Sequence, residues 1–410
     1  MWEPTADCRG YYRRVVRVRT TSSCARLPAL VLSALIVAPI AGDARADQSQ
    51  VFPSDPLWTI PIKDKPVAAP ASSGERVFIA LQSGLLAHAL GDRRELWRSP
   101  TVADGPMVAT SDRLVVPTKG AIVALDATTG NEVWKLPVEQ LTAPMVAHRE
   151  YVIVAVGEQL SAYSLADGTL AWTTAGWPNP LGRVEQRSTA HENWLYVPVA
   201  DGRIVSLDLG SGVKIWETDR IGIRPAEPLV VGDRLFVGSE EKHFCSFQVS
   251  KPKELWCFEV GAAILGAPAI DARRVYFVAV DNQIWALDRR NGSRMWKSSL
   301  GYRPSAGPTV IGDTVSAPGN TAKLPAFSTA TGKPSGQLEL SEVLVWPALF
   351  IPPAEGVPVR VAVLYGSLSN EWKLTVAGRP PAVLPSIKAE PLTVLPGRVV
   401  RLPAARFPRE

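Results

Sequence analysis

The chain has 410 residues, of which 46% are hydrophobic and 20% charged, a composition that excludes an intrinsically disordered protein and provides for a sizeable core. The net charge of +5 arises at the two ends: residues 1–46 carry seven arginines against three acids, and residues 379–410 carry six basic residues against two acids. The body between them is therefore mildly acidic, and we find no basic patch with interleaved aromatic residues that would indicate nucleic-acid binding.

The first 46 residues predict an export signal. A group of arginines precedes the apolar run 27–40, which is followed by the small-x-small sequence Ala44-Arg45-Ala46. The run is too short to span a bilayer comfortably. We expect cleavage after Ala46 and a periplasmic protein, and the alternative is a signal anchor retained in the membrane. No cysteine stands just after the apolar run, so the sequence contains no lipid-attachment site.

Tryptophan recurs at a period of about forty residues. The separations are 39, 37, 38, 44, 40 and 40 residues, and the positions are Trp58, Trp97, Trp134, Trp172, Trp216, Trp256 and Trp296. Three of these residues end the same phrase, Leu-Asp-x-x-x-Gly-x-x-x-Trp, which begins at Leu125, Leu207 and Leu287. In that phrase the aspartate can accept hydrogen bonds from the turn backbone, and the glycine can adopt the positive φ of a tight hairpin. Each repeat also contains upstream alternating runs, so it predicts a four-stranded antiparallel unit whose outer strand carries the tryptophan.

The ends of the repeat region determine the expected number of blades. Repeats closing at Trp97 through Trp296 and a degenerate copy at Gly336 make seven. Residues 343–377 contain three alternating runs without a closing strand, whereas Leu57-Trp58-Thr59-Ile60 is a closing strand without a blade. We therefore expect residues 47–378 to form an all-β, eight-bladed β-propeller in which the N-terminal strand closes the ring. The missing tryptophan at Gly336 leaves a seam that is either a partner groove or a decayed repeat, and we favour decay.

The phrase Ala-Leu-Asp-x-x-x-Gly-x-x-x-Trp, complete at 124–134 and 286–296, resembles the repeat of the pyrroloquinoline-quinone (PQQ)-like propeller family. The resemblance implies an eight-bladed ring. The resemblance does not decide the function of the chain, because the repeat is shared by quinoprotein dehydrogenases and by non-enzymatic scaffolds of the BamB type, which assist outer-membrane protein assembly.

The sequence favours a scaffold over an enzyme. The adjacent cysteine pair of the family's alcohol dehydrogenases is missing, as are the insertions that cover the quinone. The repeated aspartates Asp126, Asp208 and Asp288 belong to outer hairpin turns, and the four histidines show no ligand spacing. We thus predict no catalytic residues, no cofactor and no metal. The alternative is a PQQ-dependent dehydrogenase or a sensor that binds a small ligand in the central funnel.

Two further groups of residues are candidates for function. The loops that lead into the inner strands carry the basic residues Lys65, Arg183, Arg187, Arg224 and Arg303, which we predict to lie on a partner-binding face. Cys245 and Cys257 flank one hairpin and can form a disulfide in an oxidising compartment.

The composition of residues 379–410, with seven prolines, predicts an extended basic tail. We expect a monomer that is at most peripheral to the membrane and binds other envelope proteins.

Overall fold

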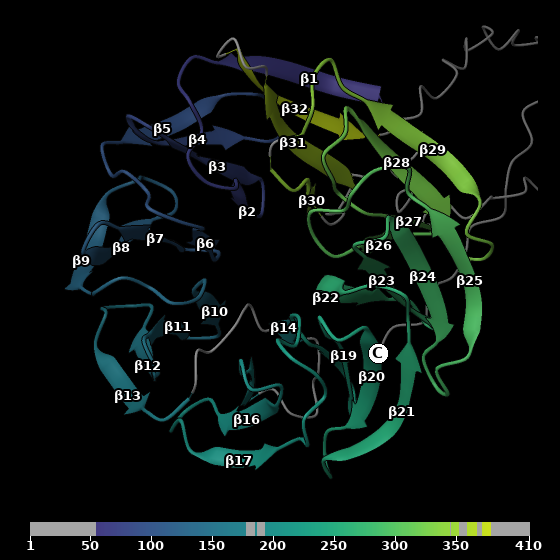
Figure 1. Cartoon of the computed structure of the whole chain (residues 1–410). Coiled ribbons are helices and arrows are strands. Elements are labelled where there is room, and N and C mark those ends of the chain that lie inside the picture. Colours follow the sequence, from purple (N-terminus) through teal and green to yellow (C-terminus); the bar gives the residue numbers. More distant parts are fainter. Residues whose placement is uncertain are drawn as a thin grey trace, which may run out of the picture. The chain divides into compact units, whose positions relative to one another are not determined.

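The computed structural model describes residues 55–177, 185–186, 193–344, 346–351, 359–366 and 371–378. The predicted signal sequence and the C-terminal tail lie outside these residues. Within the unit that spans residues 43–410, the described residues form eight β-sheets arranged as the blades of a ring (Figure 1). The predicted all-β, eight-bladed propeller is thus confirmed. The described residues form no helix, and hence none that could cross a membrane.

Five blades are built from four consecutive antiparallel strands. The first contains β2 (Ala71–Ser73), β3 (Arg76–Leu81), β4 (Gly84–Ala89) and β5 (Glu95–Ser99). The second contains β6 (Val108–Ala109), β7 (Arg113–Thr118), β8 (Ala121–Asp126) and β9 (Glu132–Pro137). The third contains β10 (Val146–His148), β11 (Tyr151–Val156), β12 (Gln159–Ser164) and β13 (Leu170–Thr174). The sixth contains β22 (Ile264–Ile270), β23 (Arg274–Ala279), β24 (Gln283–Asp288) and β25 (Arg294–Ser299). The seventh contains β26 (Thr309–Ile311), β27 (Thr314–Ser316), β28 (Lys323–Ser328) and β29 (Pro334–Glu339).

The fourth and fifth blades depart from this plan. Among the described residues, the fourth blade has three strands, β15 (Trp194–Pro198), β16 (Ile204–Asp208) and β17 (Lys214–Glu217). The fifth has β18 (Leu229–Val231), β19 (Arg234–Gly238), β20 (His243–Gln248) and β21 (Lys253–Glu259). The short strand β14 (Glu185–Gln186), which precedes the fourth blade in sequence, pairs in parallel with β18 on the inner edge of the fifth.

The eighth blade is closed by the N-terminal strand, as the orphan closing strand predicted. Strand β1 (Asp55–Ile62) lies outermost, followed by β32 (Trp372–Gly378), β31 (Arg360–Gly366) and β30 (Leu349–Ile351). The β1–β32 register runs from Asp55 opposite Gly378 to Ile62 opposite Trp372. Because these two strands lie more than three hundred residues apart in sequence, their pairing joins the two ends of the ring.

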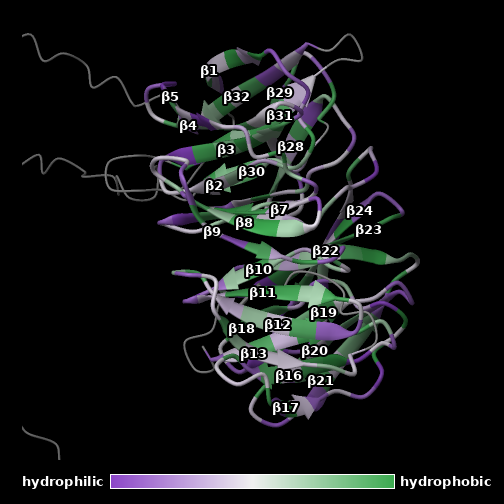
Figure 2. Cartoon of the chain, turned by 90° about the vertical axis from the view of Figure 1, so that its left-hand side faces the viewer, coloured by the Kyte–Doolittle hydropathy of each residue, from purple (hydrophilic) through white to green (hydrophobic). Residues whose placement is uncertain are grey.

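The hydrophobic core lies between blades. Each of the eight interfaces between neighbouring blades contains its own cluster of buried residues. In Figure 2, hydrophobic residues accordingly follow the strands, whereas hydrophilic residues concentrate in the turns. The interface of the seventh and eighth blades, which lacks a closing tryptophan, is filled by mostly aliphatic residues that include Leu338, Leu344 and Val361. The described residues therefore pack across this seam.

The seven repeated tryptophans lie on the outer strands, where each exposes only 7–9% of its surface. Five of them donate a hydrogen bond from the indole Nε1 to a backbone carbonyl of the next blade: Trp58, Trp97, Trp134, Trp172 and Trp296. The acceptor for Trp134, for example, is Leu165 O at 3.0 Å. The tryptophan thus links its own blade to the following one, as well as covering buried surface.

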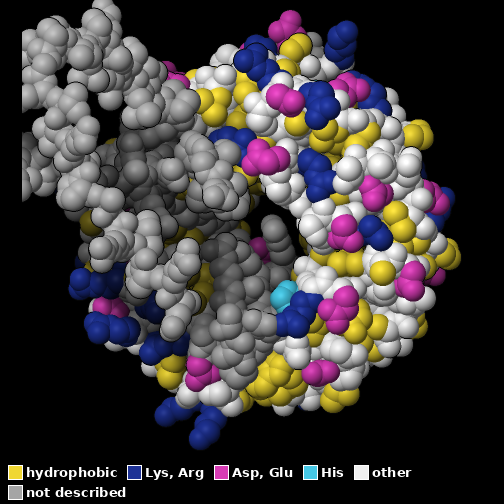
Figure 3. All heavy atoms as spheres, turned by 180° about the vertical axis from the view of Figure 1, so that it is seen from behind, with side chains coloured by type: hydrophobic (Ala, Val, Ile, Leu, Met, Phe, Trp, Pro, Cys, Tyr) yellow, Lys and Arg dark blue, Asp and Glu magenta, His cyan; other side chains and the backbone are white. Residues whose placement is uncertain are grey.

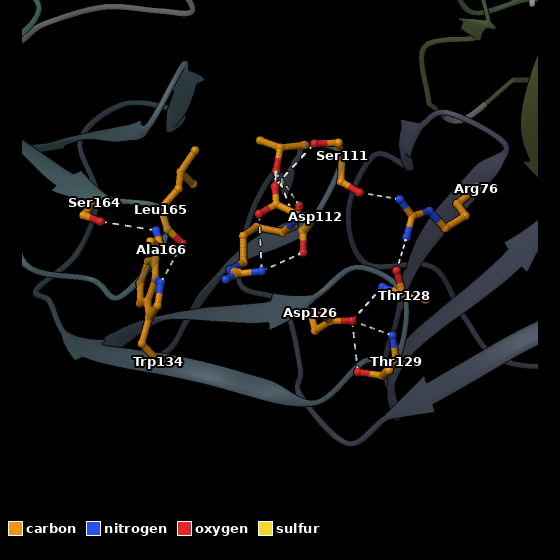
Figure 4. Close-up of polar contacts among 12 residues, drawn as sticks. Arg76, Ser111, Asp112, Asp126, Thr128, Thr129, Trp134, Ser164, Leu165 and Ala166 are labelled. Atoms are coloured by element: carbon orange, nitrogen blue, oxygen red, sulfur yellow. Dashed lines mark hydrogen bonds and ion pairs between the residues drawn. The ribbon is translucent and has the colours of Figure 1, made fainter.

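Arginine provides a second link between blades, which the sequence analysis missed. The second strands of five blades begin with this residue, at Arg76, Arg113, Arg234, Arg274 and Arg360. Arg76 donates to Ser111 O and to Thr128 Oγ1 of the next blade (Figure 4). Arg234 donates to the carbonyls of Arg289 and Arg290 in the same way. The phrase Asp-Arg-Leu marks two of these arginines, Arg113 and Arg234, but most of the acceptors are backbone carbonyls, which no side-chain pattern reveals.

Candidate partner-binding face

Two sets of connections emerge on one side of the ring, which we call the loop face. One set joins the outer strand of a blade to the inner strand of the next, as in residues 63–70, 218–228 and 300–308. The other set joins the second and third strands of a blade, as in residues 82–83 and 239–242. Because strand direction alternates within a blade, the remaining turns emerge on the opposite side, which we call the hairpin face.

Three of the predicted basic residues occupy the same position on the loop face. Lys65, Arg224 and Arg303 each precede a proline that forms an isolated bridge with the end of the second strand in its blade. These bridges join Pro66 to Leu81, Pro225 to Ser239, and Pro304 to Gly319. All three basic side chains are exposed, so the structure gathers them on one face of the first, fifth and seventh blades. Arg183 and Arg187 lie outside the described residues.

Acidic residues from neighbouring turns accompany these cations. Arg224 lies 3.8 Å from Glu240, and Arg220 in the same loop lies 3.4 Å from Glu241. Asp64 accepts hydrogen bonds from the backbone N–H groups of Lys65 and Ser83. Hydrogen bonding by Ser83 and, less strongly, the backbone N–H of Lys65 lower the pKa of Asp64, although partial burial opposes the shift. The loop face is therefore a surface of mixed charge.

Exposed aliphatic residues stand among these charges, and the sequence analysis missed them. Val67, Val102, Ile223 and Val343 are between 37% and 47% exposed, and all four lie in the connections between blades. Val343 precedes Leu344, whose bridge to Tyr365 is equivalent to the proline bridges, and only the structure reveals this equivalence. Single exposed aliphatics are common on protein surfaces, and a binding surface of mixed polar and apolar character can use them as contacts.

The inner strands β2, β6, β10, β26 and β30 line a channel pocket of about 590 Å³. Alanine, proline, methionine and valine dominate its lining, and His148 is its single titratable side chain. A quinone with calcium needs several oxygen ligands and an acidic base. Among the described residues, the one cluster of potential metal ligands is Cys245, Glu254 and Cys257 on an outer hairpin, and its two cysteines are joined by a disulfide. The described residues of this pocket therefore do not fit such a cofactor, and the carboxylate Glu227 lines two other pockets.

The repeated aspartates accept hydrogen bonds from the backbone of their own turns. Asp126 Oδ1 accepts hydrogen bonds from the backbone N–H groups of Thr128 and Thr129, and these bonds lower the pKa of Asp126 (Figure 4). Asp208 accepts equivalent bonds from Ser211, and Asp288 from Arg290. Since the turns lie at the outer edge of the hairpin face, these carboxylates are remote from the channel.

Cys245 and Cys257 face each other on β20 and β21, with their Cα atoms 4.1 Å apart, and the structure joins them by a disulfide. Cys245 is buried against the fourth blade, whereas Cys257 is exposed on the outer strand. The bridge therefore ties the outer strand of the fifth blade to its third strand.

Known proteins share both the sequence repeat and the fold. The family model described as "Outer membrane protein assembly factor BamB" matches residues 82–222 and 221–343. BamB of Moranella endobia is 24% identical over 311 residues, which cover 68% of this chain and 80% of that protein.

Solved structures share the ring. BamB from Moraxella catarrhalis superposes with a TM-score of 0.65 at 19% identity, covering 80% of this chain and all of that one. A quinohemoprotein alcohol dehydrogenase from Comamonas testosteroni superposes with a TM-score of 0.61 at 12% identity, covering 80% of this chain and 77% of that one. These similarities establish the fold, whereas the sequence match extends over more than half of the chain. The chain belongs to the family of outer membrane protein assembly factor BamB.

Proposed function

We propose that this protein is a non-catalytic scaffold of the periplasm that presents its loop face to proteins that assemble the outer membrane. The observation that carries the proposal is the match of residues 82–343 to a family described by that assembly role. The equivalent placement of Lys65, Arg224 and Arg303, with exposed aliphatics between them, supports the loop face as the binding surface.

A rigid ring suits this role physically. The blade interfaces hold the core, so the loops can vary in sequence without disturbing it. The poor fit of the 590 Å³ pocket to a calcium-bound quinone supports a scaffold over a dehydrogenase. The proposal also includes removal of residues 1–46 on export and an extended tail from residue 379.

A pull-down from envelope extracts tests the proposal. Replacing Arg224 and Arg303 by Glu reverses two charges on the loop face, and we expect the captured assembly proteins to fall at least about tenfold. The matched control replaces Lys135 on β9 and Lys297 on β25, two outer strands, by Glu and should capture the same proteins as wild type. Unchanged capture by the Arg224→Glu, Arg303→Glu variant would remove the loop face from the proposal.

A further inference from the structure

Exposed basic residues gather on the hairpin side of the fifth, sixth and seventh blades. They belong to four separate turns: Lys251 and Lys253 at the β20–β21 turn, Arg273 before β23, Arg290 and Arg294 at the β24–β25 turn, and Lys333 before β29. We call these six residues the basic edge. In the space-filling view of the side away from the viewer in Figure 1, Lys and Arg side chains gather along the rim over β21 and β25 (Figure 3).

Some acidic residues near the basic edge are engaged, and one of them pairs with a residue of the edge itself. Asp271 pairs with Arg274 at 2.9 Å, outside the basic edge, whereas Asp288 pairs with Arg290 of the basic edge at 3.3 Å. Asp233 accepts hydrogen bonds from Gln248 and Ser250 within its own blade. The remaining acids of these turns are Glu254 and Asp313. The cations of the basic edge thus outnumber the acids that could neutralise them.

The opposite arc of the hairpin face has the reverse balance. Its turns in the second, third and fourth blades carry the acids Asp112, Asp126, Glu132, Glu150, Asp167 and Asp208. The basic residues of those turns are Arg113, Arg149 and Lys214. The hairpin face is therefore polarised across the ring, and this polarity determines which side of the ring attracts an anionic partner.

The arrangement of the basic edge favours a broad anionic surface over a single small ligand. Its cations stand on four turns along a rim, and their long side chains extend into solvent. Leu255, which is 38% exposed, lies on β21 two residues after Lys253, where the register of β20 and β21 shifts. An exposed leucine beside lysines matches the boundary between headgroups and acyl chains, where apolar and cationic side chains both find partners.

We infer that the basic edge binds the phosphate groups of an anionic membrane surface. A ring held by this edge would keep the loop face, on its other side, available to proteins. This inference goes beyond the proposed function and does not depend on it, because lipid binding needs no assembly partner. Each Lys or Arg close to an anionic leaflet contributes about a fivefold gain in binding.

Vesicle co-sedimentation tests the inference with the full exported chain. Wild-type protein should bind vesicles that contain 30 mol% phosphatidylglycerol, should not bind pure phosphatidylcholine vesicles, and should dissociate as salt rises, in line with screening on a length scale of about 10 Å at 0.1 M. The variant Lys251→Glu, Lys253→Glu, Arg294→Glu, Lys333→Glu changes only exposed side chains and should bind the anionic vesicles at least about tenfold more weakly.

A matched variant separates this edge from net charge and from the loop face. Lys63→Glu, Lys65→Glu, Lys119→Glu, Arg303→Glu makes the same charge change on the loop face and should bind vesicles as wild type does. Equal losses in the two variants, wild-type binding by the basic-edge variant, or absence of wild-type binding would each overturn the inference. If wild-type protein fails to bind vesicles and an acidic protein is captured through the basic edge, the edge is the binding site of a protein partner. Circular dichroism and melting curves confirm that both variants are folded.

Discussion

The indole ring of Trp97 lies directly against Gly130 of the next blade, so that a Cβ added to Gly130 would come within 2.6 Å of two ring carbons. The same relationship joins Trp134 to Gly168, Trp172 to Gly212, Trp256 to Gly292 and Trp296 to Gly332. The glycine of the repeated phrase is therefore needed for two reasons, since it has a positive φ and also supports the tryptophan of the preceding blade.

Two glycines with the same backbone conformation separate these reasons. Gly130 has φ of 75° and Gly120 has φ of 76°, but a Cβ on Gly120 would meet nothing within 4 Å. We expect Gly120→Ala to lower the free energy of unfolding by about 1 kcal/mol for the left-handed backbone alone. Gly130→Ala should cost about 1–3 kcal/mol more, because the indole must move. Urea denaturation of the two variants measures the difference, and equal losses would contradict a role for the ring contact.

Tryptophans that differ in hydrogen bonding offer a second comparison. Trp134 donates to Leu165 O, whereas Nε1 of Trp256 is buried with no hydrogen-bond partner among the described residues. Both Trp134→Phe and Trp256→Phe lose similar buried area. Trp134→Phe should lose about 1 kcal/mol more of unfolding free energy, because it leaves the Leu165 carbonyl unpaired. If Trp256→Phe proves the more damaging, the indole hydrogen bond contributes little to blade docking.

Asp271 should make stability depend on pH in the acid range. Burial opposes ionisation of this carboxyl, but hydrogen bonds from Tyr276, from the backbone of Arg273 and from the backbone and side chain of Arg274 outweigh it and lower the pKa of Asp271. Because the pKa of Asp271 is lower in the folded state, its ionised carboxylate stabilises the fold at pH values above the unfolded-state pKa of about 3.9. This stabilisation is lost as the pH falls through the folded-state pKa.

Substitution tests this linkage. Asp271→Asn should destabilise the protein by about 1–3 kcal/mol at pH 7, and the difference from wild type should shrink below about pH 4. Tyr276→Phe should shift the acid unfolding transition to higher pH, because the carboxylate loses a donor. Melting curves between pH 2 and pH 7 provide the measurement. A difference between wild type and Asp271→Asn that stays constant with pH would exclude the proposed ionisation.

The Cys245–Cys257 bridge closes a short loop, with a sequence separation of 12 residues. In the chain-entropy account, cross-linking a loop of this size stabilises a fold by about 2–3 kcal/mol. We expect the two cysteines of native protein from the periplasm not to react with a thiol reagent. We also expect Cys257→Ser to lower the melting temperature by as much as reduction of the wild-type disulfide does. Two reactive thiols in the native protein would refute the bridge.

The blades were predictable because their signals repeat in the sequence. Seven tryptophans at regular spacing defined the outer strands, and the unmatched strand at Trp58 required a partner at the other end of the chain. The parallel pairing of β14 with β18 was not predictable, because Glu185–Gln186 carries no strand pattern and pairs outside its own repeat.

The candidate site was only partly predictable. Lys65, Arg224 and Arg303 could be grouped from their loop contexts, but the acid beside Arg224 comes from Glu240, on a turn at a different position of the repeat. The basic edge was missed for the same reason, since its residues come from turns of three blades that only the closed ring brings to one side.

Site-specific photocrosslinking in living cells tests the central claim most directly. A crosslinking amino acid at Val102, Ile223 or Val343 probes the loop face, and at Val133, Leu170 or Leu255 it probes exposed aliphatic positions on the outer strands. The account predicts crosslinks to outer-membrane assembly proteins from the loop face and few or none from the outer strands. Crosslinks to those proteins from the outer strands, with none from the loop face, would contradict it.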